Sequence, residues 1–196
     1  MLKAIIFDFG GVLLRTHDHS YRTRWDDKVG LLHGEFENYI FNSDVGVQAQ
    51  LGQVTWQVIW MEAQKRFHLS DEESHQAQRD FFRGDTLDTD LVDDIRHLKE
   101  HYLIGLLSNT HYPNGNTLLR EHNLNILFDF SVTSAEVGIM KPDPQIYHIV
   151  LERGGISAHQ ALFIDDSLSN IQTAKKLGMK TIHFTNPKTV REALIS

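Results

Sequence analysis

Three short apolar runs that each end at polar residues constrain the fold of this chain more than any other feature. The runs span residues 4–7, 103–107 and 161–164, and weaker runs lie near residues 128–134 and 180–184. A strand that is apolar along its whole length is buried on both faces, which is typical of a parallel sheet covered by helices. We therefore expect a central parallel sheet.

Helical patterns lie between these runs. Residues 90–101, 144–153 and 168–177 each place their apolar side chains on one stripe, as an amphipathic helix does. The alternation of strands and helices predicts an α/β fold with a three-layer, Rossmann-like, doubly wound parallel sheet.

Residues 15–85 interrupt this alternation, because they contain no convincing strand but several amphipathic helices. The segment looks like a helical insert placed between the first strand and the rest of the sheet. We therefore expect a core domain made of residues 1–14 and 86–196, with the insert as a separate helical unit.

Two helix starts inside the insert carry recognisable capping residues. Thr55 is expected to cap a helix whose apolar stripe includes Trp56 and Trp60. Ser70 and Glu73 have the spacing of a capping box for the next helix. At helical spacing, the tryptophans are interpreted as core residues rather than as a site for stacking a ligand.

The amino-acid composition limits the kinds of partner that the chain is expected to bind. Its 19 Lys and Arg residues stand against 26 Asp and Glu residues, so the net charge of −7 offers no cationic surplus for a nucleic-acid backbone. The absence of cysteine excludes disulfides and thiolate metal sites and fits a reducing cytosol. No apolar run approaches the roughly 20 residues that span a bilayer. We expect a soluble, cytoplasmic protein that binds neither nucleic acid nor membrane; its oligomeric state is left open.

Side chains able to do chemistry follow the ends of the expected strands. In an open α/β sheet, ligands bind outside the carboxyl ends of the strands, so these positions are expected to converge. A lysine that precedes a proline, and so lies in an extended loop, joins them. The set is Asp8, Ser108, Asn109, Lys141, Asp165 and Asp166.

These residue types fit phosphoryl transfer. Asp8 can attack phosphorus as a carboxylate nucleophile, while Ser108 and Asn109 can hold phosphoryl oxygens. Lys141 can neutralise those oxygens and restrain Asp8. The two adjacent aspartates after the fourth strand would repel each other unless a cation lies between them and Asp8, and Mg²⁺ prefers such oxygen ligands. The expected partners are Mg²⁺ and a small phosphate ester.

Four segments together resemble motifs I to IV of the haloacid dehalogenase-like (HAD) hydrolases, in the order of that family. The segments read IIFDFGGVLL, LLSNT, GIMKPDPQIY and LFIDDSLSNIQTAKKLGMKTI. The helical insert matches the place and size of the family's first-type (C1) cap. The resemblance implies a sheet with strand order 5-4-1-2-3 and a helical cap at residues 15–85. The glucose-1-phosphate phosphatase-like and epoxide hydrolase N-terminal phosphatase-like members are the most similar in pattern.

The resemblance also implies roles for individual residues. Asp8 matches the nucleophile, Ser108 and Asn109 match the phosphate binders, and Lys141 matches the lysine of motif III. Asp166 matches the direct metal ligand, with Asp165 beside it and Asn170 in a supporting position. The backbone carbonyl of Gly10 is implied as a further ligand of Mg²⁺.

Position 10 departs from the family's phosphatases, which carry an acid there to protonate the leaving oxygen and activate water. General acid–base help of this kind contributes about 10²–10⁴-fold. One interpretation is a Mg²⁺-dependent phosphatase whose substrate, such as a sugar phosphate with a good leaving group, needs little protonation. His17, His19 or His111 could then replace the acid.

Two other interpretations stay open. A 2-haloacid dehalogenase also lacks the second acid and carries Ser-Asn in motif II, although it needs no metal and does not usually keep the acid pair. The other is a catalytically silent domain that retains the fold and a binding pocket. We favour the phosphatase, because Asp8, Lys141 and the acid pair are all present.

A competing metal pattern lies at His97, Glu100 and His101, which spell the H-x-x-E-H of inverted zinc peptidases. The apolar stripe of the expected helix explains this segment without a metal. We interpret the pattern as a solvated helix face.

Overall fold

The central element is a sheet of five parallel strands with the order β5-β4-β1-β6-β7. The computed structural model describes residues 1–188 and residue 190. The strands are β1 (Ala4–Phe7), β4 (Leu103–Ser108), β5 (Phe130–Thr133), β6 (Ala161–Asp165) and β7 (Lys180–His183). Numbered along the chain from one to five, they give the expected order 5-4-1-2-3 read from the β7 edge. The α/β fold and its strand order are confirmed.

The register of the sheet brings three strand ends level with one another. Phe7 of β1 pairs with Leu106 of β4 on one side and with Ile164 of β6 on the other. The residues that follow these three positions therefore emerge at the same edge of the sheet. All four residues of β1 are buried, as its apolar run predicts.

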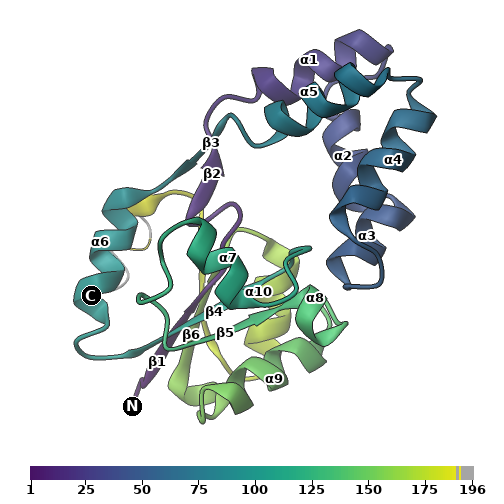
Figure 1. Ribbon diagram of the computed structural model, residues 1–196. Coiled ribbons are helices and arrows are strands. Elements are labelled where there is room, and N and C mark those ends of the chain that lie inside the picture. Colours follow the sequence, from purple (N-terminus) through teal and green to yellow (C-terminus); the bar gives the residue numbers. More distant parts are fainter. Residues whose placement is uncertain (189, 191–196) are drawn as a thin grey trace.

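Helices cover both faces of the sheet (Figure 1). On one face, α6 (Thr89–Leu98) and α7 (Gly115–Glu121) pack on Ile5, Phe7 and Ile104. On the other face, α9 (Pro144–Arg153) and α10 (Leu168–Lys176) pack on Ile6 and Leu107. Two short elements complete this part of the chain, α8 (Ser134–Val137) and the 3₁₀ turn η1 (Ala158–Gln160). The three-layer prediction is confirmed.

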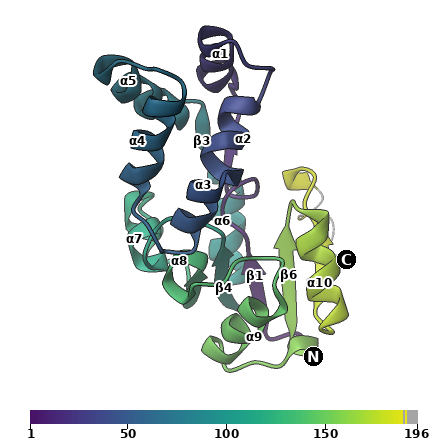
Figure 2. The same ribbon diagram turned by 90° about the vertical axis from the view of Figure 1, so that its right-hand side faces the viewer.

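The segment from residue 20 to residue 81 forms five helices with a hydrophobic cluster of their own (Figures 1 and 2). These are α1 (Ser20–Val29), α2 (Glu35–Asn42), α3 (Asp44–Gln50), α4 (Trp56–Arg66) and α5 (Asp71–Phe81). The cluster centres on aromatic side chains, including Trp25, Phe36, Trp60 and Phe81. We call residues 20–81 the helical segment.

A two-stranded ribbon corrects the expectation that residues 15–85 contain no strand. β2 (Leu14–Thr16) pairs antiparallel with β3 (Asp85–Leu87) and links the helical segment to the sheet (Figure 1). Each strand has only three half-exposed or exposed residues, too few for a periodic signal. Polar contacts outside the strand pattern hold the ribbon: Arg15 donates to Asp88 at 2.6 Å and Thr16 to Asp85 at 2.7 Å.

The two capping predictions have different outcomes. Ser70 and Glu73 form the expected capping box of α5, with both reciprocal hydrogen bonds present. Thr55 stands at the N-cap position of α4, but its side chain makes no capping hydrogen bond, so that expectation is wrong. Trp60 is buried, as expected of a core residue, whereas Trp56 is only half-buried. Among the described residues, no helix is both long and apolar enough to cross a bilayer.

Candidate active site

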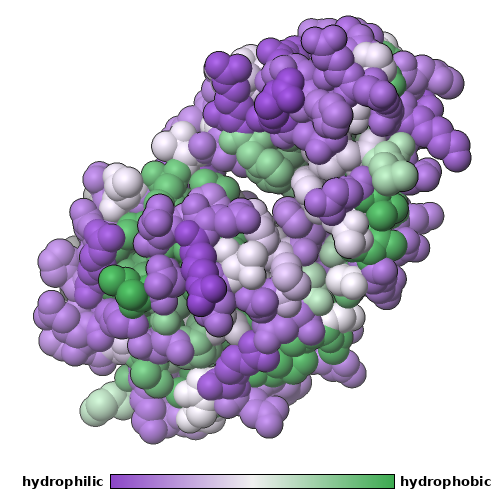
Figure 3. All heavy atoms as spheres, viewed as in Figure 1, coloured by the Kyte–Doolittle hydropathy of each residue, from purple (hydrophilic) through white to green (hydrophobic). Residues whose placement is uncertain are grey.

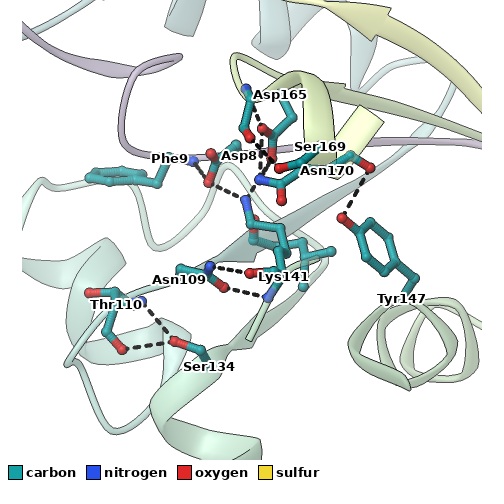
Figure 4. Close-up of polar contacts among 12 residues, drawn as sticks. Asp8, Phe9, Asn109, Thr110, Ser134, Lys141, Tyr147, Asp165, Ser169 and Asn170 are labelled. Carbon is teal, nitrogen blue, oxygen red and sulfur yellow. Dashed lines mark hydrogen bonds and ion pairs between the residues drawn. The ribbon is translucent and has the colours of Figure 1, made fainter. Parts of the chain in front are cut away.

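Asp8 is the first residue after β1, and its carboxylate is nearly buried. Its Oδ1 accepts a hydrogen bond from the Phe9 backbone N–H at 2.7 Å. The same oxygen lies 2.7 Å from Nζ of Lys141 (Figure 4). Both contacts use Oδ1, so Oδ2 is the oxygen left to reach a bound ligand.

Lys141 is buried in the loop before α9 and is held on three sides. Its Nζ donates to Asp165 Oδ2 at 2.7 Å and to the Leu107 carbonyl at 3.0 Å, in addition to its contact with Asp8. Burial acts to lower the pKa of Lys141, but the carboxylates of Asp8 and Asp165 outweigh it and raise the pKa above its usual value. The lysine is therefore a fixed cation between two buried carboxylates.

Asp165 ends β6, and protein donors occupy its carboxylate. Asn170 donates from Nδ2 to both oxygens at 3.0 and 3.1 Å, and the Ser167 backbone N–H donates to Oδ1 at 2.8 Å. The carbonyl of Asn170 accepts in turn from the Tyr147 hydroxyl at 3.1 Å (Figure 4). Asp165 and Asn170 thus fix the position of Lys141.

Asp166, the next residue, points its carboxylate at the loop that follows β1. A Cβ built on Gly11 would lie 2.1 Å from Asp166 Oδ2, and Gly11 has a φ of +79°. Only a glycine fits there, because the carboxylate takes the space of a side chain and the backbone is left-handed. Burial, together with Asp165, raises the pKa of Asp166.

Carboxylate oxygens of Asp8, Asp165 and Asp166 lie within 4.8 Å of one another. These three aspartates form the only metal-compatible group of three or more His, Asp or Glu residues among the residues the structure describes. Three hard oxygen donors with no nitrogen or sulfur fit Mg²⁺. Since Asp165 is already occupied by protein donors, Asp8 and Asp166 are the ligands available to a cation.

Ser108 is the last residue of β4 and Asn109 follows it, at the same edge of the sheet. Ser108 is buried. The side-chain amide of Asn109 holds the backbone of Lys141 at two points: Nδ2 donates to its carbonyl at 2.9 Å, and Oδ1 accepts from its N–H at 2.8 Å (Figure 4). In this arrangement, the amide positions the lysine loop rather than pointing to a ligand.

Two further residues shape the site and were missed in the sequence. Ser134, the first residue of α8 directly after β5, accepts a hydrogen bond from the Thr110 N–H at 2.9 Å and so braces the loop after β4 (Figure 4). Its place at the end of the run expected near residues 128–134 was the available signal. Gly11 is the second residue that was missed, and the pair of glycines after Asp8 and Phe9 was the available signal for it.

A cavity of about 830 Å³ adjoins the site, lined by residues next to Asp8 in the chain but not by Asp8 or Lys141 themselves. Its wall includes Gly10, Ser108 and Asp166, together with residues of the helical segment such as Phe41. Figure 3 shows the molecule hollowed between the helical segment and the α/β part. The candidate site therefore faces a space bounded by both.

The histidines proposed as substitutes for the missing acid are placed differently. His19 and His111 line the cavity, whereas His17 is exposed and is not part of its wall. His111 stacks on Trp56 of α4, with ring centroids 4.0 Å apart and planes 15° apart. Burial lowers the pKa of His111 to about 4, so its imidazole is neutral at physiological pH.

The zinc interpretation of His97, Glu100 and His101 is not supported by the geometry. α6 ends at Leu98, so Glu100 and His101 lie beyond the helix that would have to present all three side chains. All three residues are exposed, and none belongs to a metal-compatible group within residues 1–188 and 190.

Asp8 carries an expected pH dependence of stability. Burial raises its pKa from 3.8 to about 7; Lys141 opposes this rise and Asp165 adds to it. Because the folded protein binds this proton more tightly than the unfolded chain, the protonated carboxyl stabilises the fold, and this contribution is complete below pH 3.8. It is lost as the pH rises through about 7 and Asp8 ionises. With a chelator present, Asp8→Asn should therefore raise the Tm more at pH 8 than at pH 5 in calorimetry. An equal gain at both pH values would contradict the assignment.

Fold and site together define an α/β protein in which aspartates and a lysine meet at the carboxyl ends of parallel strands. A family model described as haloacid dehalogenase-like hydrolase matches residues 2–178. The chain belongs to this family of hydrolases, as the four motifs indicated.

Relatives named as phosphatases match nearly the whole chain. The chain is 28% identical to a sesquiterpene phosphatase of Aspergillus oryzae over 94% of its length and 90% of that protein. It is also 28% identical to a D-ribitol-5-phosphate phosphatase of Bacteroides thetaiotaomicron, over 99% of its own length and 97% of that protein. A HAD family enzyme of the same bacterium, solved as a magnesium complex, has the same fold with a TM-score of 0.81 at 22% identity, covering 100% of this chain and 99% of that one.

Proposed function

We propose that the protein is a Mg²⁺-dependent phosphatase that hydrolyses a small phosphomonoester through a phosphoryl group carried on Asp8. The observation that carries this proposal is the buried Asp8 carboxylate, held through one oxygen by Lys141 at 2.7 Å beside the Asp166 carboxylate. An aspartate fixed in this way can approach phosphorus along a defined line, and phosphoryl transfer depends mainly on positioning and charge neutralisation.

Two displacements at phosphorus complete the reaction. In the first, Asp8 Oδ2 forms a bond to phosphorus while the bond to the leaving oxygen breaks and its electron pair stays on that oxygen. In the second, water attacks phosphorus, which breaks the bond to Asp8 and returns the carboxylate. Lys141 neutralises charge next to Asp8 in both displacements, and the proposed binders of the phosphoryl oxygens are Ser108 and the backbone N–H groups around Asn109.

Mg²⁺ fits the donor set, and we propose Asp8, Asp166 and the backbone carbonyl of Gly10 as its protein ligands. When bound, the ion would neutralise the phosphoryl oxygens and the neighbouring carboxylates. Asp165 and Asn170 support this site through Lys141 rather than by direct ligation, because both carboxylate oxygens of Asp165 already accept hydrogen bonds and Asn170 holds that carboxylate.

Gly11 and Gly10 offer a matched pair of substitutions for the metal site. A Cβ on Gly11 would collide with Asp166 at 2.1 Å, whereas a Cβ on Gly10 meets nothing within 4 Å. Gly11→Ala is expected to weaken Mg²⁺ binding by about 10–100-fold, since it displaces a ligand. Gly10→Ala should leave binding close to that of the unaltered protein. Titration calorimetry measures both, and equal affinities for the two variants would contradict the assigned ligand.

The helical segment is proposed to act as a cap. We assign residues 15–85 to this cap and residues 1–14 and 86–196 to the catalytic core; residues 189 and 191–196 of that range lie outside the described part of the chain. Two contacts support a cap that lies over the site: Trp56 stacks on His111 of the core, and Gly52 approaches the backbone of Ala135. A cap in this position would exclude water and select the substrate.

Phosphate release from a panel of phosphate esters tests the proposed function. The panel includes p-nitrophenyl phosphate, glucose 1-phosphate and ribitol 5-phosphate, each with Mg²⁺ and with a chelator. Release should require both Mg²⁺ and Asp8, so that Asp8→Asn and the chelated enzyme are inactive. Halide release from a 2-haloacid without metal would instead establish the dehalogenase, and no release of either kind would leave a silent domain.

A further inference from the structure

The cavity that adjoins the site is much larger than a phosphoryl group and has aromatic walls. Its volume of about 830 Å³ lies near the upper end of the range of roughly 300–1,000 Å³ for small-molecule pockets. Apolar side chains line it from both parts of the chain. They are Phe9, Leu14, Phe41, Phe82, Leu87 and Leu118.

Several polar side chains in the same wall are engaged with one another. Arg22 is ion-paired with both Glu37 and Asp85, and its contact with Asp85 Oδ1 measures 2.8 Å. Tyr112 donates its hydroxyl to Glu121. A pocket selects hydroxyl-rich ligands through buried polar groups that only the ligand can pair, and these groups already have protein partners.

The loop after β4 adds an uncharged aromatic surface. His111 lies between two rings, 4.0 Å from Trp56 and 4.5 Å from Tyr112. Phe82, which lines the cavity, packs on Trp56 of the helical segment with ring centroids 5.8 Å apart, so Trp56 supports both aromatic parts of the wall. Stacked, neutral rings bury apolar surface well and present no charge to a ligand.

Independently of the cavity wall, the residue at position 10 sets how acidic the leaving group must be. Gly10 faces the cavity beside Asp8 and carries no side chain that could donate a proton to the departing oxygen. A leaving oxygen that is already acidic departs without such help, whereas the oxygen of an ordinary alcohol does not.

We propose that the substrate is a phosphoryl group attached through an acidic oxygen to a large apolar body. This inference rests on the proposed function and adds the class of substrate. Aryl phosphates and diphosphates of apolar alcohols both have this chemistry. In either case Asp8 Oδ2 bonds to the terminal phosphorus, and the electron pair of the broken bond leaves on the phenolate or on the remaining phosphate.

Matched substrates separate the two parts of the proposal. With Mg²⁺, kcat/KM for 1-naphthyl phosphate should exceed that for phenyl phosphate by about tenfold, because a second ring is buried. Both should exceed glucose 1-phosphate and ribitol 5-phosphate. Geranyl diphosphate should exceed geranyl phosphate by about 10²-fold, because its leaving oxygen belongs to a phosphate and is far more acidic than that of an alcohol. The faster of 1-naphthyl phosphate and geranyl diphosphate identifies the aryl or the diphosphate source.

Phe82 supplies a variant that tests the wall itself. It lines the cavity and is 39% exposed, so truncation should not unfold the protein. Phe82→Ala should lower kcat/KM for 1-naphthyl phosphate by about fivefold and barely change that for phenyl phosphate, while Phe82→Leu restores most of the loss. Leu32→Ala, at a residue 75% exposed and outside the cavity wall, is the control.

Two results would overturn the inference while the proposed function stands. One is Mg²⁺-dependent hydrolysis that prefers the sugar phosphates, and the other is equal rates for geranyl phosphate and geranyl diphosphate. If the enzyme releases phosphate from none of these compounds or from p-nitrophenyl phosphate, the proposed function itself fails, and the inference fails with it.

Discussion

Lys141→Met is expected to lower the free energy of unfolding by about 3–5 kcal/mol and to abolish phosphate release. The side chain is 1% exposed, and its Nζ lies 2.7 Å from both Asp8 Oδ1 and Asp165 Oδ2. Without the ammonium group, two buried carboxylates face each other with no cation between them. Turnover should fall by at least about 10²-fold, because the nucleophile loses the group that fixes and neutralises it.

Urea unfolding in the presence of a chelator measures this effect on the protein alone. Lys99→Met is the matched control, because its Nζ pairs with Asp129 at 2.6 Å on a surface where both side chains are about one-third exposed. A half-exposed pair of this kind contributes at most about 1 kcal/mol. Equal losses of stability in the two variants would contradict the role of Lys141 as the cation that balances two buried carboxylates.

Gly10→Asp is expected to accelerate the hydrolysis of alkyl phosphates by about 10²–10⁴-fold. The new carboxyl would stand two residues after Asp8, where it can protonate the leaving oxygen and then activate water. Its Cβ meets no atom within 4 Å, and residue 10 does not have the left-handed φ of Gly11, so the structure can accept the side chain. Substrates with acidic leaving groups, such as p-nitrophenyl phosphate, should gain little.

The experiment is interpreted by comparing the rate gain on alkyl phosphates with the gain on p-nitrophenyl phosphate. A gain confined to alkyl phosphates such as geranyl phosphate identifies the missing proton donor as the limit on their hydrolysis. If Gly10→Asp binds Mg²⁺ and releases phosphate from p-nitrophenyl phosphate but gains nothing on alkyl phosphates, another group already supplies the proton. His19, which lines the cavity, would then be examined by substitution with alanine.

The parts of this structure that were predictable from sequence depend on local patterns. Continuous apolar runs identify the buried strands, and the rule that ligands bind at the carboxyl ends of parallel strands places Asp8, Lys141 and Asp166 together. The capping box at Ser70 is equally local, since its two members are three residues apart.

Features that depend on tertiary geometry were not predictable. The two hydrogen bonds of the Asn109 amide to the Lys141 backbone could not be predicted, because two loops from different strands meet at that point, whereas phosphate binding at Ser108 and Asn109 stays a prediction. The stack of Trp56 on His111 joins residues far apart in the chain, and no periodicity signals such a pair. The ribbon of β2 and β3 is too short to leave a pattern.

Capture of the phosphoryl group on Asp8 tests the central claim most directly. Enzyme in excess would be mixed with radiolabelled p-nitrophenyl phosphate and Mg²⁺, quenched in acid within one turnover, digested and mapped, with Asp8→Asn as the control. The label should appear on the peptide that contains Asp8, decay at the rate of phosphate release, and be absent from the variant. Phosphate release at full rate with no label on Asp8 at any time, or with the label on another residue, would contradict the proposed mechanism.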